Sequence, residues 1–111
     1  MTTSNQADLH AKIFDPAGLI AYQDGSVVSR TIVIRKCGTI TLFAFDADEG
    51  LSEHTAPFDA IVQVLDGEAG ITIGQERFNL EKGQMIIMPA NVPHALQAEK
   101  KFKMMLTMIH T

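Results

Sequence analysis

Two histidines carry the side chains best suited to chemistry in this sequence, and each stands where a turn meets an apolar stretch. His54 precedes the turn Thr-Ala-Pro-Phe-Asp and the apolar run 60–65. His94 follows the apolar run 85–88 and the turn Pro-Ala-Asn-Val-Pro. Because imidazole titrates near neutral pH and is a frequent metal ligand, either side chain could act as a base or bind a metal. We therefore expect both histidines at the ends of strands.

The segments around the histidines are short runs of β-branched, aliphatic and aromatic residues separated by turn residues. We predict strands over 27–34, 39–45, 60–65, 69–73, 77–80, 85–88, 94–98 and 102–109. In the run 60–65 every residue except Gln63 is apolar, which predicts burial on both faces. Asp15 followed by Pro16 predicts an N-cap and one or two helical turns within 15–22. Many short strands with almost no helical periodicity favour an all-β antiparallel sandwich or barrel, foremost a jelly roll.

Length and composition indicate one folded domain. The 111 residues suffice for a single modest core. We expect residues 1–12 to form a loose polar lead-in with a solvated His10, and residues 13–111 to form one barrel domain. With 46% apolar and 20% charged residues, the composition is typical of a soluble globular protein, and the longest apolar runs have the length of strands.

Charge and cysteine content narrow the partners and the compartment. The formal net charge is −4, and Lys100, Lys101 and Lys103 form the only basic cluster, which argues against a nucleic-acid partner. The lone Cys37 cannot form an intramolecular disulfide, and the N-terminal residues lack the pattern of a signal peptide. We therefore expect a cytoplasmic protein without a membrane partner, and we assign Cys37 no role.

The segment around the second histidine resembles the second motif of the cupin family, G-x5-P-x-G-x2-H-x3-N. Gly83, Pro89 and His94 occupy the family positions. Asn91 stands at the second glycine and Ala98 at the asparagine. Asn tolerates positive φ, so the first of these changes is mild.

The segment around the first histidine is similar to the first cupin motif, G-x5-H-x-H-x3-4-E-x6-G. His54 and Gly67 match it, whereas Ala56 stands at the second histidine and Ala60 at the glutamate. Asp48 replaces the opening glycine. The resemblance implies a small single-domain cupin with an RmlC-like jelly roll, in which the double-stranded β-helix encloses a cavity.

The resemblance also implies a metal site that this chain keeps only in part. Cupins hold Fe, Mn, Ni, Cu or Zn on imidazoles and a carboxylate. Of the four ligand positions only His54 and His94 retain a ligand, so we expect any divalent metal to bind weakly or not at all. Ala56, Ala60 and Val62 share the parity of His54 on extended chain and should line the cavity beside it.

Donors from other strands could complete a site, although each has a simpler interpretation. Gln63 has the wrong parity for the cavity and is expected to face outward. Methionine fills cores more often than it binds metal, and a histidine next to the C-terminus is usually solvated. The remaining candidates are His110, Gln97, Met85, Met88, Met104, Met105 and Met108.

Two functions remain open at this point. The first is a binding module whose cavity holds a small molecule, oriented by His54 and His94. The second is a metal-dependent cupin enzyme of the dioxygenase, isomerase or decarboxylase type, with a reduced two-histidine ligand set.

We also expect a homodimer, because apolar residues of the parity of Ile61 and Leu65 face away from the cavity and need a cover. The strand 27–34 is the candidate for pairing across that interface.

Overall fold

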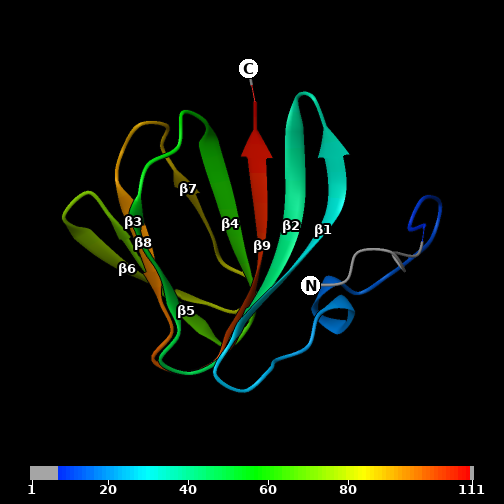
Figure 1. Cartoon of the computed structure of the whole chain (residues 1–111), viewed down its shortest axis with the longest axis horizontal. Helices are drawn as coiled ribbons and strands as arrows, with labels where there is room; N and C mark the ends of the chain where they lie inside the picture. Colours follow the sequence, from blue (N-terminus) through cyan, green and yellow to red (C-terminus); the bar gives the residue numbers. More distant parts are fainter. Residues whose placement is uncertain (1–7, 111) are drawn as a thin grey trace.

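The protein is a sandwich of two antiparallel sheets, as the computed structural model of residues 8–110 shows (Figure 1). The fold class predicted from the sequence is confirmed. The larger sheet has the strand order β1-β2-β9-β4-β7, and the smaller sheet has the order β3-β8-β5-β6. The strands are β1 Val27–Arg35, β2 Gly38–Phe45, β3 Gly50–His54, β4 Asp59–Asp66, β5 Glu68–Ile73, β6 Glu76–Glu81, β7 Met85–Met88, β8 His94–Gln97 and β9 Phe102–Ile109.

Strand β3 is the element that the sequence pattern did not single out. Its residues, Gly-Leu-Ser-Glu-His, lack both alternation and β-branched side chains. It forms because β8 offers a partner: Leu51 pairs with Leu96, and His54 pairs with His94. Pairing with a strand distant in sequence therefore decides this element, and it places the first histidine.

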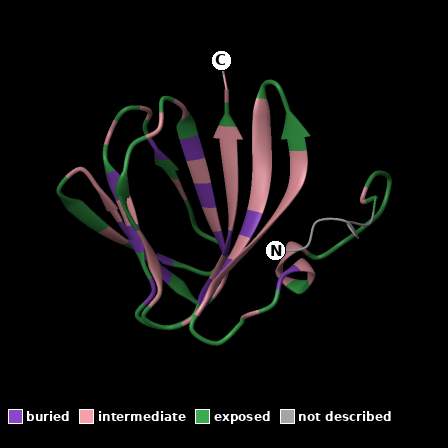
Figure 2. Ribbon diagram, in the orientation of Figure 1, coloured by how far each residue is buried: buried purple, intermediate pink, exposed green. Residues whose placement is uncertain are grey.

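The core between the sheets combines aromatic and aliphatic side chains. Buried residues alternate with less buried ones along β4 (Figure 2). The rings of Phe45 and Phe102 stack with centroids 4.5 Å apart, and both residues are fully buried. Phe43 stacks on Phe45 from the same face of β2, with ring centroids 5.9 Å apart. Burial along β4 alternates, so the prediction that run 60–65 is buried on both faces is wrong. Val62 and Val64 face the core, and Ile61 is only partly covered on the other face.

A segment near the N-terminus covers part of the outer face of the larger sheet. The predicted helical turn is a 3-10 helix, η1 Pro16–Leu19, and the Asp15 carboxylate accepts a hydrogen bond from the Ala17 N–H at 3.1 Å. Ile20, immediately after it, is buried against Leu42 and Ala44 of β2. Apolar contact with this segment thus replaces part of the cover that a partner chain would otherwise provide.

Tyr22 fixes the end of this covering segment to the sheet. Its hydroxyl donates a hydrogen bond of 2.6 Å to Asp66, and burial together with Asp66 raises the pKa of the phenol. The ammonium groups of Lys101 and Lys103 lie 4.9 and 5.0 Å from the ring centroid. The Lys103 ammonium also donates to the Ala17 carbonyl at 2.7 Å. Asp66 of β4, Lys103 of β9 and Lys101 just before β9 therefore meet around Tyr22, which holds the covering segment against the sheet.

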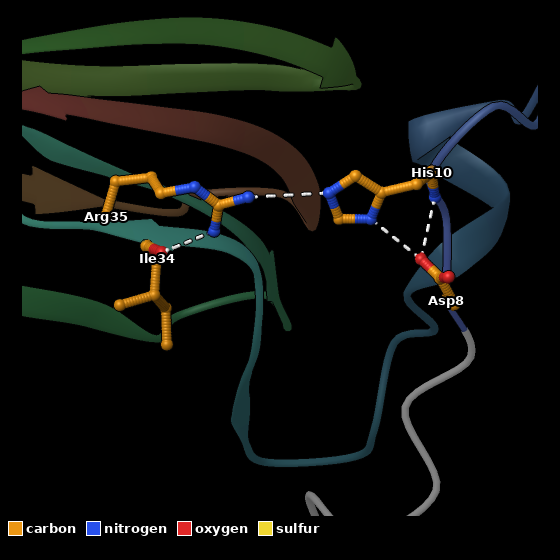
Figure 3. A network of polar contacts seen from close by, with 4 residues as sticks. All are labelled: Asp8, His10, Ile34 and Arg35. Carbon is orange, nitrogen blue, oxygen red and sulfur yellow. Dashed lines mark hydrogen bonds and ion pairs between the residues drawn. The ribbon is translucent and has the colours of Figure 1, made fainter.

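The described part of the predicted lead-in, residues 8–12, lies beside the end of β1 (Figure 3). Residues 1–7 of that lead-in lie outside the described residues. His10 is exposed, as expected, but its ring is not isolated: Nδ1 lies 2.7 Å from the Asp8 carboxylate, and Nε2 lies 3.4 Å from the Arg35 guanidinium. Arg35 in turn donates to the Ile34 carbonyl at 2.7 Å. Exposed contacts of this kind contribute little stability.

Two turns, one before β3 and one before β8, use left-handed backbone. Asn91, which takes the place of a family glycine, has φ of 65°, and Asp48 at the other missing glycine has φ of 69°. Asn and Asp adopt this region more readily than other residues with a Cβ. The two departures from the glycine pattern are therefore conservative in backbone terms. Gly67 also has positive φ, and a Cβ there would overlap the Lys101 carbonyl.

Candidate ligand site

The two histidines meet at one end of the sandwich interior. His54 is the last residue of β3 and His94 is the first of β8, and the two are direct partners in the sheet register. Their Nε2 atoms are 3.2 Å apart. The ring centroids are 4.4 Å apart with an interplanar angle of 72°. The structure therefore brings together the two residues that the sequence singled out.

The other ring nitrogens establish the tautomer of each histidine. Nδ1 of His54 lies 2.7 Å from the Ser52 carbonyl, and Nδ1 of His94 lies 3.2 Å from the Val92 carbonyl. Because a carbonyl oxygen can only accept, each Nδ1 must carry the proton. Nε2 of each neutral ring is then an unprotonated acceptor. With both rings neutral, two lone pairs meet 3.2 Å apart, and a proton shared between the two nitrogens or a donor beside them would relieve their repulsion.

Burial keeps one of the pair neutral. His94 is 4% exposed, whereas His54 is exposed at the rim. Burial lowers the pKa of His94, and a positive charge on His54 would lower it further; the hydrogen bond to the Val92 carbonyl acts in the opposite direction. His94 is therefore a weaker base than an ordinary imidazole, and its Nε2 stays an acceptor near neutral pH.

The acceptors face a cavity of about 100 Å³ that is otherwise apolar. Ala56 and Ala60 contribute small side chains to its wall, as expected from their parity with His54. The lining contains no Asp, Glu, Lys or Arg, so only protonation of a histidine would place a charge in the cavity. The lining residues are Leu51, His54, Ala56, Ala60, Met88, His94, Leu96, Met104, Leu106 and Met108.

Several other sequence candidates lie elsewhere. Val62 is fully buried in the core and does not line the cavity. Gln63 faces away from the core, between the buried residues Val62 and Val64, as its parity predicted. His110 stacks on Phe58 with ring centroids 4.2 Å apart, and Gln97 is exposed.

The methionines divide between the two faces of the larger sheet. Met88, Met104 and Met108 line the cavity, whereas Met85 is exposed and Met105 packs on the outer cluster. Sequence reasoning did not identify the leucines of the wall, Leu51, Leu96 and Leu106. Parity along β8 and β9 could have identified the last two, but Leu51 depends on the unpredicted strand β3.

A larger hollow of about 340 Å³ lies over the outer face of β3 and β8. Its wall includes Ser52, Thr72 and Gln97 and no titratable side chain. It offers hydrogen bonds but neither a metal ligand nor an acid or base. The barrel cavity is therefore the better candidate for a specific site.

A four-ligand divalent metal centre does not fit the residues present. Within residues 8–110 no group of three or more His, Cys, Asp and Glu side chains is arranged to hold a metal ion. Ala56 and Ala60 occupy the positions from which the missing imidazole and carboxylate would come. Cys37, the only cysteine, is exposed at the β1–β2 turn and remote in sequence and sheet register from the histidines.

The cupin domain family matches residues 41–110, which is more than half of the chain. The chain belongs to the cupin family. Among solved structures, this cupin is similar to a conserved protein of unknown function from Streptococcus pyogenes, with 39% identity and a TM-score of 0.87, over 92% of this chain and 90% of that one. The family expected from the two motifs is thereby confirmed.

Two further solved structures have the same barrel. A cupin 2 conserved barrel domain protein from Leptotrichia buccalis is 39% identical with a TM-score of 0.84, over 86% of this chain and 47% of that one. A cupin superfamily protein from Desulfitobacterium hafniense is 27% identical with a TM-score of 0.86, over 91% and 93%. No curated protein matches the chain. Within the described residues, no helix is long and apolar enough to cross a membrane.

Proposed function

We propose that this cupin is a binding protein whose barrel cavity takes one small molecule, held at its polar end by Nε2 of His54 and His94. The observation that carries the proposal is the pair of acceptor nitrogens 3.2 Å apart at the end of an apolar cavity. Sites of this kind bind by apolar contact and orient the ligand through a few polar groups.

The tautomers of the histidines define the ligand class. Both Nε2 atoms accept, so the ligand must bring a hydrogen-bond donor such as N–H or O–H. No lysine or arginine lines the cavity, so a carboxylate would lose its hydration without gaining a counter-ion. A cavity of about 100 Å³ suits a compact ring or branched chain, since a cavity of about 150 Å³ accommodates benzene.

The alternative function, a metal-dependent cupin enzyme of the dioxygenase, isomerase or decarboxylase type, has less support. Such chemistry needs a divalent Fe, Mn, Ni, Cu or Zn ion held firmly with open positions for substrate. The wall supplies two imidazoles and no carboxylate. Restoring the ligands tests this alternative: the double variant Ala56→His with Ala60→Glu should bind a divalent transition metal orders of magnitude more tightly than the native chain.

Pyrrole and furan provide a matched test of the binding proposal. They are five-membered rings of nearly the same size, and only pyrrole has an N–H donor. In isothermal titration pyrrole should bind several-fold more tightly than furan, because a net hydrogen bond contributes about 1 kcal/mol. Butyrate, which is similar in size but anionic, should not bind.

Two variants test whether the histidine acceptors select the ligand. His94→Leu should abolish the preference for pyrrole over furan, and Gln97→Ala, whose side chain is exposed, should preserve it. Equal binding of furan and pyrrole, or binding of butyrate in preference to both, would show that the two acceptors do not select the ligand.

We further propose that a second copy of the chain covers the rest of the outer face of the larger sheet. The sheet register aligns an uncharged row across all five strands, and Ile87 at its end is 59% exposed. The row consists of Val33, Ile40, Thr107, Ile61 and Ile87. Light scattering should give the mass of a dimer, and Ile87→Lys should reduce it to that of a monomer. A native monomer at micromolar concentration would refute this.

A further inference from the structure

Two thioethers flank the position at which the family carboxylate is missing. Ala60 is paired in register with Met88 on one neighbouring strand and with Met108 on the other. All three residues line the cavity of His54 and His94. Side chains directly opposite on adjacent strands have Cβ atoms about 5 Å apart, and methionine has three rotatable bonds. The sulfur atoms can therefore reach the space that the short Ala60 side chain leaves empty.

The imidazole pair has the spacing of two ligands on one ion. Two nitrogens at about 2.0 to 2.1 Å from a tetrahedral metal are about 3.3 to 3.4 Å apart. The observed Nε2 separation is 3.2 Å, and the backbone carbonyls of Ser52 and Val92 hold both rings with these nitrogens unprotonated. Carbonyl contacts to the second ring nitrogen are the usual support of a metal-binding histidine.

The charge and softness of the wall oppose a divalent ion and favour a soft monovalent one. No carboxylate lines the cavity, so the charge of a bound ion would be unneutralised. The cost of moving an ion out of water rises with the square of its charge, which makes a divalent ion about four times as costly as a monovalent one. Thioether sulfur with imidazole nitrogen is a donor set that selects Cu(I).

We infer that His54, His94, Met88 and Met108 form a binding site for a soft monovalent metal ion, Cu(I). The metal site rests on the same two Nε2 atoms as the proposed function. It adds a second class of occupant for them. A metal ion and a pyrrole N–H would compete for the same lone pairs. The site differs from the divalent family site because its two additional donors are sulfur from β7 and β9 and not a further imidazole and a carboxylate.

Silver(I) is the probe, because it has the softness and charge of Cu(I) without its oxidation chemistry. The exposed Cys37 thiol would bind silver itself, so the experiment uses Cys37→Ser as the background. In calorimetric titration of the untagged protein we expect one Ag(I) per chain. Zn(II) should bind at least about a thousandfold more weakly.

Matched methionine variants test whether sulfur is a ligand. The double variant Met88→Leu with Met108→Leu preserves apolar volume and should weaken Ag(I) binding by about tenfold or more. Met85→Leu, whose side chain is exposed on the opposite face, should leave it unchanged. X-ray absorption of the Cu(I) form, prepared without oxygen, should show both sulfur and nitrogen neighbours. Far-ultraviolet circular dichroism verifies that each variant is folded.

The outcomes separate this inference from the proposed function. Zn(II) binding as tight as Ag(I), or Ag(I) binding that survives the double methionine variant, would overturn the soft-metal site. Selective pyrrole binding to metal-free protein with no uptake of Ag(I) would overturn it while leaving the proposed function intact. Uptake of Ag(I) that depends on both methionines, without a preference for pyrrole over furan, would support the metal site and overturn the proposed function.

Discussion

The two ends of the sandwich interior share strand β9 and differ in the size of the side chains that face inward. At one end Phe45 and Phe102 stack and are fully buried. At the other end Ala60 faces the leucine and methionine wall and a cavity of about 100 Å³ remains. Strand β9 passes through both, from Phe102 in the packed end to Met108 in the cavity.

The difference separates the end that contributes most of the stability from the end where we propose that a ligand binds. Burial of large aromatic side chains contributes the most apolar area. The cavity end gives up some of that contact and gains a space with two acceptors. One strand can serve both ends because alternate residues face inward and each can be chosen separately for size.

The largest effect is expected from creating a cavity at the packed end. Phe102→Ala should destabilise the protein by about 3 to 5 kcal/mol, because the ring is fully buried and stacked on Phe45. Urea unfolding followed by circular dichroism measures it. Ile109→Ala, on the same strand but 48% exposed, is the control and should cost much less. Similar losses for the two variants would show that the packed end is not the main source of stability.

Adding the same side chain at the two ends should cost different amounts of stability. Ala69 is 1% exposed in the main core, so Ala69→Leu should overpack it and cost about 1 to 3 kcal/mol. Ala60→Leu enters the cavity, so its cost should be below about 1 kcal/mol while pyrrole binding disappears. Unfolding and calorimetry on both variants give the two quantities. If Ala60→Leu were the more destabilising, the interior at Ala60 would be packed and not open.

A smaller effect is expected from the titration of His94. Its folded-state pKa lies below the unfolded value of about 6.5, so the unfolded chain binds more protons as the pH falls. Stability from this residue should be complete above that unfolded pKa and decrease as the pH falls from it toward the folded pKa. A single proton limits the slope to about 1.4 kcal/mol per pH unit.

The measurement is the free energy of unfolding against pH for native protein and for His94→Gln. The variant should lose this part of the slope, whereas His10→Gln, at an exposed position, should keep it. Identical pH profiles for native protein and His94→Gln would mean that burial does not control the titration of this residue.

Local chemistry was sufficient to predict most of the fold. Turn residues and apolar runs located eight of the strands and the helical turn, since these signals depend on neighbours in sequence. The motif residues also predicted part of the cavity wall, because His54, Ala56, Ala60 and His94 all line the cavity. The left-handed backbone of Asn91 agrees with the conformation expected at the glycine that it replaces.

Tertiary structure decided the features that depend on partners distant in sequence. Strand β3, which carries little local signal, exists through its pairing with β8. The tautomers of both histidines follow from which carbonyls lie beside Nδ1, and no sequence pattern specifies that. The placement of Met88 and Met108 on either side of Ala60 is a matter of strand order and register. Composition and periodicity determine which faces are apolar, but only the folded chain determines which donors share one space.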